Sequence, residues 1–377
     1  MSEHQYVAFR AIDRALSEKN LAYMRQQSSR AEITPWSFEN EYHYGDFHGN
    51  AMEMLRRGYD IHLHYANFGI RTLLIRLPGG FPDARAAKPY LDGESLRFVK
   101  DKNGPGGTLA IEPSYEPDDL DELWEPAKIF DRLVPLRSEI LDGDLRPLYL
   151  AHLAVARDGN HDPEETVEGP VPAGLREPTD AQRALAEFYG IGETLVAAAA
   201  RESGPLPAVA DQRTRYAEWL AEQPEARKNA WLLEVLSDPG SSVRSEIRAE
   251  FAKASSRPSW PTVEAGRTLA QLGAAAEEIE RDQEKEAAAK AARQRASRLK
   301  KMAAAPTPYL RKTEQLVAER STDAYEQIGE LLADLRDALA HSGQSDLAEK
   351  QARKLKTENP TLRLLTAALR RRGFLPK

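Results

Sequence analysis

The chain contains no cysteine. This absence excludes disulfides, thiolate zinc sites, iron–sulfur clusters and a cysteine nucleophile, so any bound metal must be held by His, Asp or Glu. Long hydrophobic runs are also missing, since no stretch approaches the roughly 20 apolar residues that cross a bilayer. Residues 1–10 show no basic segment followed by an apolar run. We therefore expect a soluble, cytoplasmic protein with no membrane partner.

Recognisable catalytic signatures are absent as well. The sequence has no Gly-x-Ser-x-Gly elbow, no Walker loop and no His-Glu-x-x-His helix. Residues 104–107 invite a phosphate-loop interpretation, but Pro105 lacks an N–H and a strand pattern follows, which favours a turn. Carboxylate pairs are uninformative among 59 acidic residues. These observations disfavour an enzyme built on a nucleotide or nucleophile motif, and we expect no cofactor.

Charge is divided unevenly along the chain. Residues 1–280 carry 31 Lys and Arg against 46 Asp and Glu, net −15, whereas residues 281–377 carry 21 against 13, net +8. An acidic body followed by a basic tail is typical of binding or assembly proteins. The length of 377 residues indicates more than one domain.

The first 157 residues predict an α+β domain, because short β-rich runs alternate with short amphipathic ones. Strands are expected at 6–12, 31–44, 61–67, 71–77, 96–100 and 109–112. Ser17 is expected to cap a helix that runs to about Ser28, and a second helix is expected near residues 50–58. From Leu123 to Ala156 the apolar spacing becomes helical.

The remaining residues predict a mainly α-helical bundle or short helical-repeat region with one long exposed helix. Residues 158–178 are polar and rich in proline and glycine, so they are predicted to be a linker. Residues 179–260 are predicted to form a helical bundle, 261–305 a long charged helix, and 306–377 a basic helical domain. The long helix lacks the large apolar heptad residues of a coiled coil, so we expect it to be exposed.

The densest unusual composition lies between Trp36 and Phe68, where twelve of thirty-three positions are aromatic or His. On a strand, His62 and His64 project to one face, where they could bind a metal with Asp46, Glu41 or Asp60 as a third ligand. A packed sheet face is the simpler interpretation, and a groove for a partner is a further one. The aromatic residues that we predict to bind a partner are Trp36, Tyr42, Tyr44 and Tyr65.

Basic side chains gather on the long helix and near the carboxyl end. They are compatible with binding to phosphates and equally with a solvated surface. The residues that we predict to contact nucleic acid, if the tail binds it, are Arg293, Arg298, Lys300, Lys301, Lys354, Arg370, Arg371 and Arg372.

Several stretches of the chain are similar to segments of uncharacterised bacterial proteins. Tyr325–Leu339 and Asn359–Leu365 resemble the carboxyl-terminal region of these proteins, and Leu269–Met302 looks like the long charged helix that precedes it. The blocks at 44–47 and 66–71 resemble their amino-terminal part. In this group the helical tail sometimes accompanies a SWIM-type zinc finger, which the present chain cannot form because it has no cysteine. The resemblance implies an architecture and transfers no site residue.

Three hypotheses for function follow from the sequence. The first is a non-enzymatic protein–protein interaction or assembly protein, an adaptor with an unidentified protein partner. The second is a nucleic-acid-associated factor that binds through the basic carboxyl-terminal helices. The third is a His/carboxylate metalloenzyme whose site lies within residues 36–68.

Overall fold

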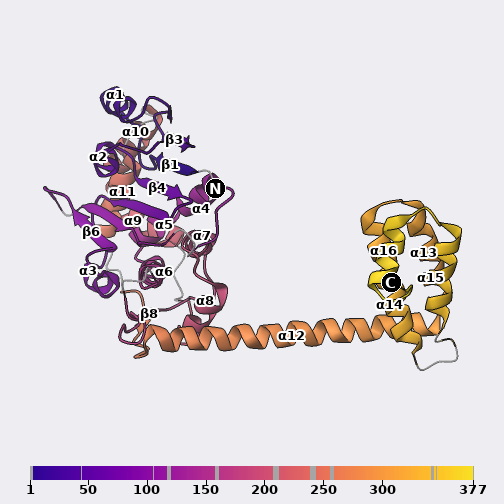
Figure 1. Ribbon diagram of the computed structural model, residues 1–377. Helices are drawn as coiled ribbons and strands as arrows, with labels where there is room; N and C mark the ends of the chain where they lie inside the picture. The colour runs from indigo at the N-terminus through magenta and orange to yellow at the C-terminus, as the bar shows by residue number, and fades with distance from the viewer. Residues whose placement is uncertain are drawn as a thin grey trace. The chain divides into compact units, whose positions relative to one another are not determined.

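A computed structural model describes residues 3–43, 45–104, 106–116, 120–157, 161–206, 212–237, 243–254, 259–340, 344 and 346–376. The chain divides into two compact units, Met1–Glu280 and Arg281–Lys377. The boundary coincides with the position at which the sequence changes from acidic to basic. Figure 1 labels the helices and strands.

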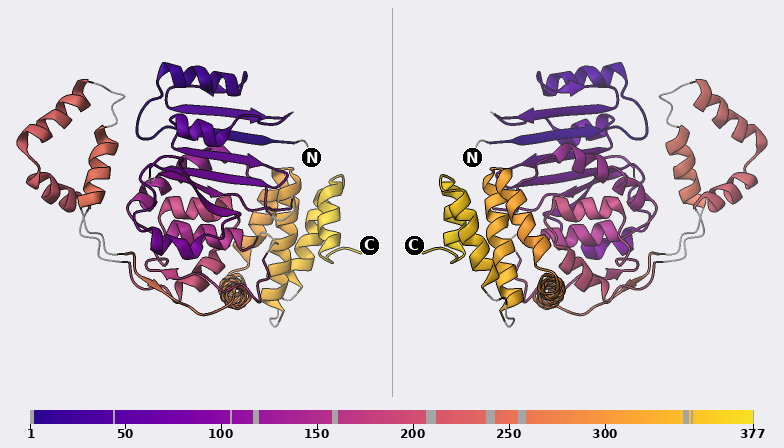
Figure 2. Two further views of the ribbon diagram at one scale, coloured as in Figure 1. Left: turned by 90° about the vertical axis from the view of Figure 1, so that its left-hand side faces the viewer. Right: turned by 90° about the vertical axis from the view of Figure 1, so that its right-hand side faces the viewer.

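Unit 1 is built on an antiparallel sheet. Within the described residues seven strands are hydrogen-bonded in the order β2-β3-β1-β4-β5-β7-β6, and Figure 2 shows them side by side. The strands are β1 (Gln5–Arg10), β2 (Glu32–Ile33), β3 (Ser37–Tyr42), β4 (Ile61–Ala66), β5 (Ile70–Leu77), β6 (Leu96–Lys100) and β7 (Gly107–Ile111).

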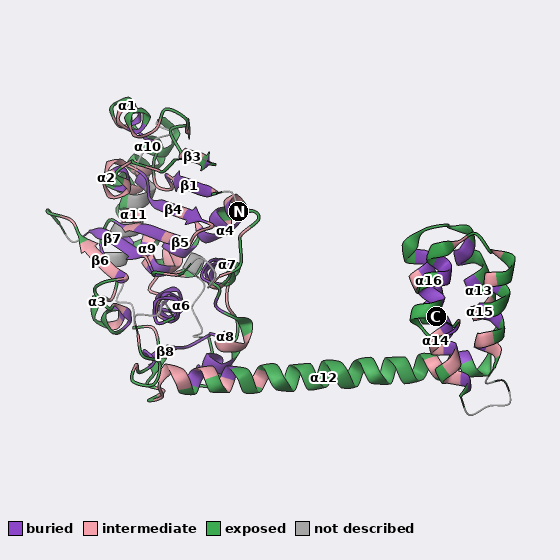
Figure 3. Cartoon of the chain, in the orientation of Figure 1, coloured by how far each residue is buried: buried purple, intermediate pink, exposed green. Residues whose placement is uncertain are grey.

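Helices cover both faces of this sheet. On one face Val7, Phe9 and Leu74 share a core with α1 (Glu18–Gln27) and α2 (Ala51–Arg57). On the other face the alternate strand residues pack with α4 (Pro126–Leu133), α5 (Leu136–Leu141), α6 (Arg146–Val155), α7 (Asp180–Phe188) and α8 (Glu193–Ala200). Strands covered on both faces read as nearly continuous apolar runs. Because helices cover both faces, every residue of β7 is buried, and Figure 3 shows most of the central strands in the colour of buried residues.

The predicted fold class is confirmed. An antiparallel sheet region is followed by a mainly helical part, and the first helix begins where Ser17 predicts it. The Ser17 side chain accepts a hydrogen bond from the Asn20 N–H at 3.4 Å, which satisfies one of the free donors of the first helical turn. A short helix α3 (Ala84–Ala87) and a 3-10 turn η1 (Lys88–Tyr90) lie between β5 and β6.

The predicted linker at 158–178 requires a correction. Residues 171–175 are buried, and β8 (Val171–Pro172) pairs with β9 (Thr262–Val263). The buried carboxylate of Glu168 accepts hydrogen bonds from Tyr149 and Arg267. Proline and glycine mark the irregular backbone correctly, but irregular backbone becomes a linker only when no other segment covers it. Here residues 168–175 belong to the core of unit 1.

The predicted bundle at 179–260 also requires a correction, because its helices pack in two separate places. Helices α7 and α8 join the sheet core, whereas α9 (Gln212–Glu222), α10 (Glu225–Ser237) and α11 (Val243–Ala254) meet around aromatic rings. Trp219 stacks on Trp231 with ring centroids 5.8 Å apart, and Phe251 is buried beneath them.

Helix α12 (Leu269–Ala304) contributes to both units. Leu272 and Ala276 lie in the core of unit 1, and Leu299 and Met302 pack in the core of unit 2. Residues 280–298 are exposed, as the green stretch of α12 in Figure 3 shows. The rest of unit 2 consists of α13 (Thr307–Ala318), α14 (Thr322–Leu339), α15 (Leu347–Glu358) and α16 (Arg363–Arg371).

Among the described residues, none of the helices combines the length and the apolar character that crossing a bilayer requires.

Candidate functional site

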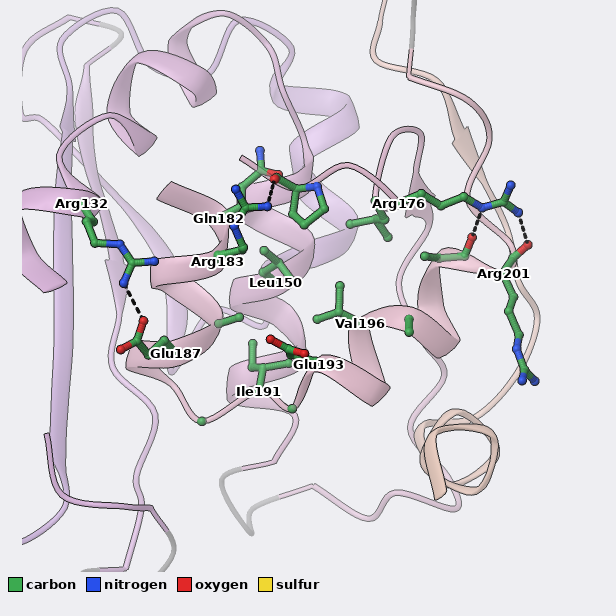
Figure 4. Close-up of a pocket in the computed structure, with 17 residues that line it drawn as sticks. Arg132, Leu150, Arg176, Gln182, Arg183, Glu187, Ile191, Glu193, Val196 and Arg201 are labelled. Atoms are coloured by element: carbon green, nitrogen blue, oxygen red, sulfur yellow. Dashed lines mark hydrogen bonds and ion pairs between the residues drawn. The ribbon is translucent and has the colours of Figure 1, made fainter. Parts of the chain in front are cut away.

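A cavity of about 860 Å³ opens beside α7 and α8 in unit 1 (Figure 4). We call it the α7–α8 groove. Its size lies within the range of ligand-binding sites, roughly 300–1,000 Å³. The lining residues come from α4, α6, α7, α8 and the segments beside them: Arg132, Leu150, Leu175, Arg176, Pro178, Gln182, Arg183, Ala186, Glu187, Gly190, Ile191, Gly192, Glu193, Val196, Ala197, Ala200 and Arg201.

Local sequence holds α7 firmly in place. Thr179 and Gln182 form a capping box at its first turn, which satisfies two backbone donors at once. The buried Gln182 amide also donates to the carboxylates of Glu139 at 2.8 Å and Asp144 at 3.0 Å. Burial raises the pKa of Glu139, although the hydrogen bonds from Thr179 and Gln182 oppose that shift. One wall of the groove is therefore fixed before any ligand arrives.

The floor of the groove is apolar. Leu150, Leu175 and Ile191 are buried beneath it, and the side chains of Ala186 and Val196 are half-buried and face it. Figure 4 shows Val196 and Ile191 directed toward Leu150. A partly open apolar floor loses water-exposed surface when a ligand covers it, which stabilises a complex by roughly 25 cal/mol per Å².

The rim of the groove is cationic. Arg132 is occupied, because it forms ion pairs with Asp180 at 3.1 Å and Glu187 at 2.6 Å. Within the described chain, Arg176 and Arg183 donate only to backbone carbonyl oxygens.

Arg201 completes the rim. The carboxylate closest to its guanidinium is that of Glu278 at 3.4 Å, and both side chains are about half exposed, at 50% and 59%. An arginine has five N–H donors. Arg176, Arg183 and Arg201 therefore retain donors for an anionic ligand, and of the rim carboxylates only Glu193 lies outside an ion pair among the described residues.

A neighbouring acidic segment meets the edge of the groove. The buried guanidinium of Arg71 donates to the Phe188 carbonyl oxygen at 2.7 Å and to the Asp121 carbonyl oxygen at 2.6 Å. It thereby joins the end of α7 to the segment at 120–125. Leu120 lies against Gly190, where an added Cβ would come within 2.4 Å of the leucine side chain.

Gly190 provides a test of this edge. Its φ of +63° is a conformation that L-residues with a Cβ disfavour by about 1–2 kcal/mol. We expect Gly190→Ala to lower the free energy of unfolding by at least about 1 kcal/mol, measured by urea denaturation. Gly79→Ala is the matched control, because Gly79 is exposed, lies outside the positive-φ region and has no atom within 4 Å of an added Cβ, so its effect is expected to stay within about 0.5 kcal/mol. Equal effects of the two substitutions would contradict the assignment of strain to Gly190.

The structure places the predicted partner-binding aromatics in different environments. Trp36 is 44% exposed, whereas Tyr42 and Tyr65 are buried and Tyr44 lies outside the described residues. The Tyr65 hydroxyl accepts a hydrogen bond from the Leu123 N–H at 3.0 Å. Tyr42 and Tyr65 are therefore core residues rather than the lining of a groove, because helices cover the sheet faces to which they belong.

The predicted histidine pair is also part of the packed interior. His62 stacks on Phe9 with ring centroids 4.0 Å apart, and its Nδ1 donates to the Ala8 carbonyl oxygen at 3.0 Å. His64 Nε2 donates to Gln5 Oε1 at 3.0 Å, and the Gln5 amide donates to Asp46 at 2.7 Å. The part of the chain that the structure describes contains no group of three His, Asp or Glu side chains arranged to hold a metal. The weak candidate site at His62, His64 and Asp46 is not formed there.

Burial also suppresses the basicity of these rings. It lowers the pKa of His62 to about 3, helped by the neighbouring His64. Burial lowers the pKa of His64 to about 4, although the Asp46 carboxylate opposes that shift. Both rings are neutral at physiological pH.

The predicted nucleic-acid residues are largely committed within unit 2. Four form ion pairs with carboxylates of the same unit, and Arg370 donates to the Pro376 carbonyl oxygen at 2.9 Å. Arg293, Lys300 and Lys301 are exposed and have no ion pair among the described residues. The pairs are Arg298–Asp334 (2.9 Å), Lys354–Glu314 (2.6 Å), Arg371–Glu326 (2.7 Å) and Arg372–Glu330 (3.0 Å).

This pairing bears on the hypothesis that the basic carboxyl-terminal helices contact nucleic acid. The carboxylates come from α13 and α14, helices that the sequence places far from the cations with which they pair. Packing of these helices brings opposite charges together, so the net charge of +8 is carried by the cations outside such pairs.

The groove itself was not among the sequence predictions, because its residues are divided among the segments assigned to an α+β domain, a linker and a helical bundle. A signal does exist in the sequence. Arg176, Arg183 and Arg201 flank the strongly apolar segment at 195–200 within an otherwise acidic region. That combination suggests an anion-binding apolar surface, although the pattern by itself does not place these residues around one cavity.

Comparisons with protein-family models, with curated proteins and with solved structures find no match for this chain. The resemblance to uncharacterised bacterial proteins therefore stays a prediction, and the function has to be argued from the geometry of the chain itself.

Proposed function

We propose that this chain is a non-enzymatic interaction protein, an adaptor whose unit 1 binds an acidic amphipathic protein segment in the α7–α8 groove. The observation that carries this proposal is the combination of an apolar floor with three arginines whose donors remain available. Amphipathic helices bind such grooves through apolar side chains spaced three or four residues apart. Arginine at the rim recognises carboxylates through paired N–H donors.

The charge of the rest of unit 1 favours an acidic ligand at this place. The sequence of residues 1–280 is acidic overall, with a net charge of −15. An acidic segment is repelled by most of this surface and attracted at the arginine rim, so the charge distribution contributes to specificity and to the rate of encounter.

The organisation of the chain also supports an adaptor. Helix α12 gives its first turns to one core and its last turns to another, and residues 280–298 between them are exposed. Helices that are polar on all sides are typical of segments that bridge domains. A second folded unit on the same chain is available for a second contact. Because four predicted nucleic-acid residues are neutralised by carboxylates, the proposal does not include nucleic acid.

The test uses the full chain and a designed probe. The probe is a fluorescent 16-residue helical peptide with leucines at positions i, i+4, i+7 and i+11 and glutamates elsewhere. Its binding is followed by anisotropy. We expect the Glu peptide to bind at least about tenfold more tightly than the same peptide with Lys in place of Glu, a difference of about 1.4 kcal/mol. Raising the salt concentration is expected to reduce this preference.

Two variants locate the binding on the chain. Val196→Asp places a carboxylate on the apolar floor and is expected to weaken binding of the Glu peptide at least about tenfold, since burying an unpaired charge is unfavourable. Leu236→Asp is the matched control, because Leu236 lies on α10 outside the groove and is 82% exposed. Equal affinities for the two peptides, or undiminished binding to the folded Val196→Asp chain, would refute the proposal.

A further inference from the structure

An exposed tryptophan lies beside the groove. Trp124 is 89% exposed, the largest fraction among the exposed apolar side chains of the described residues. Its backbone is nevertheless held, because the preceding Leu123 N–H donates to the Tyr65 hydroxyl and the Asp121 carbonyl oxygen accepts from Arg71. A large aromatic side chain on an anchored segment is the residue type that dominates protein interfaces when a partner covers it.

The surroundings of Trp124 are acidic. Residues 116–125 contain six Asp and Glu and no Lys or Arg. Asp121, Glu122 and Glu125 are exposed on either side of the indole, and Glu125 also pairs with Lys128 at 2.5 Å. The segment therefore combines an apolar anchor with carboxylates, which is the complement of an apolar floor with an arginine rim.

The groove of the same chain does not receive this indole, because Trp124 is exposed and its neighbours are tied to Arg71 and Tyr65. A second copy of the chain offers both an open α7–α8 groove and an exposed Trp124 segment. Leu120 lies against Gly190, so the acidic segment and the edge of the groove are adjacent in each chain. Adjacent complementary surfaces suit a two-fold contact in which each copy gives one anchor and receives another.

We infer that the α7–α8 groove binds the acidic Trp124 segment of a second copy of this chain, and that the chain forms a two-fold dimer through this reciprocal exchange. The inference rests on the proposed function and names the ligand of the same groove. Trp124 enters the apolar floor beside Val196, and the carboxylates at 121, 122 and 125 approach the guanidinium groups of Arg176, Arg183 and Arg201.

The first experiment measures the mass of the full chain by size-exclusion chromatography with light scattering over a range of concentrations. The wild-type chain is expected to approach the mass of a dimer as its concentration rises. Trp124→Ala and Val196→Asp are each expected to raise the dissociation constant at least about tenfold. High salt is expected to weaken the dimer as well, because carboxylates and arginines meet across it. A wild-type chain that stays monomeric at about 100 μM overturns the inference.

A mixing experiment tests the reciprocal geometry. The Val196→Asp chain keeps its indole and the Trp124→Ala chain keeps its groove, so an equimolar mixture retains one of the two contacts. We expect the mixture to form a heterodimer that neither variant forms with itself at the same concentration. If both variants are monomeric and the mixture remains monomeric, the proposed exchange is wrong.

The peptide probe separates this inference from the proposed function. Trp124→Ala is expected to bind the Glu peptide at least as tightly as the wild-type chain, because its groove is intact and no longer occupied by a second copy. Loss of the dimer with retained peptide binding supports both statements. A dimer that persists in Trp124→Ala overturns the exchange alone. A Glu peptide that no chain binds overturns the proposed function, whatever the oligomeric state.

Discussion

Replacement of Arg137 by methionine is expected to remove a large part of the stability of unit 1. The Arg137 side chain is only 1% exposed, and its guanidinium bonds Asp13 at 3.0 Å and Asp60 at 3.1 Å. It also donates to the Arg76 carbonyl oxygen at 2.8 Å. Without the guanidinium, two carboxylates remain close together in a poorly solvated place. Removing one partner of a buried ion pair typically costs about 3–5 kcal/mol.

The state of Asp60 indicates why the loss should be large. Burial raises the pKa of Asp60 although the Arg137 guanidinium opposes that shift. Asp60 also accepts backbone hydrogen bonds from Ile12 at 2.6 Å and Asp13 at 3.0 Å. When the cation is lost, the carboxyl group must either remain charged and poorly solvated or take up a proton, and either outcome lowers the free energy of unfolding.

Urea denaturation at pH 7 measures this effect. Total stabilities of domains are about 5–15 kcal/mol, so a loss of about 3–5 kcal/mol moves the midpoint strongly. Arg132→Met is the matched control, because Arg132 also pairs with two carboxylates, Asp180 and Glu187, but all three side chains reach water. Its effect is expected to stay within about 1 kcal/mol. If the two substitutions cost the same, burial is not the cause of the stabilisation by Arg137.

A double variant tests whether the lost stability comes from the buried carboxylate that Arg137→Met leaves without a cation. Adding Asp60→Asn to Arg137→Met removes the buried negative charge that the first substitution leaves without its partner. The double variant is expected to regain part of the lost stability, because replacing both members of a buried pair is less costly than removing one. A double variant less stable than Arg137→Met would argue for a role of the pair other than charge compensation.

Acid is expected to destabilise unit 1 below about pH 6.5 through two buried histidines, His62 and His64. An unfolded histidine binds a proton near pH 6.5, whereas the folded chain holds the pKa of His62 at about 3 and that of His64 at about 4. Between these values the unfolded state binds more protons than the folded state, so stability falls as the pH falls. Above pH 6.5 both states bind no proton at these rings, and the effect disappears.

The slope of the free energy of unfolding against pH follows from the number of protons that only the unfolded chain binds. Each histidine that is neutral only in the fold contributes a slope of up to about 1.4 kcal/mol per pH unit, so the pair contributes up to about 2.7 kcal/mol per pH unit between about pH 6 and pH 4. Burial lowers the pKa of His152 as well, which acts in the same direction. Urea midpoints measured from pH 7.5 to pH 4.5 should therefore decline steadily.

Glutamine substitutions assign the slope to the two rings. The unfolded chain binds more protons than the folded chain at these rings. His64→Gln is expected to reduce that difference by up to about one proton, and the double variant His62→Gln, His64→Gln by up to about two. Both changes keep an N–H donor for Gln5 or for the Ala8 carbonyl oxygen. A slope that persists in the double variant would assign the acid sensitivity to other groups.

The local elements of unit 1 could be predicted from the sequence because their signals are local. Short β-rich runs marked β1 and β4, a dense apolar run marked β5, and Ser17 marked the start of α1. Alternation at 31–44 predicted one strand, which the structure divides into β2 and β3. The change of charge near residue 280 coincides with the boundary between the two units. These features depend on residues close together in the chain, which backbone propensity and capping can specify.

Packing between distant segments decided the candidate site. Residues 168–175, predicted as part of a linker, are core because β9 and Arg267 cover them. The predicted metal ligand His62 is a neutral core residue because it is buried against Phe9. The groove arises where α6, α7 and α8 meet, and the exposure of Trp124 depends on anchors at Tyr65 and Arg71, more than 50 positions earlier. Local sequence patterns determined which elements form, and composition determined which charges they carry. Only the tertiary structure decided which side chains lost water and which kept it, because burial depends on contacts between residues that sequence spacing does not relate.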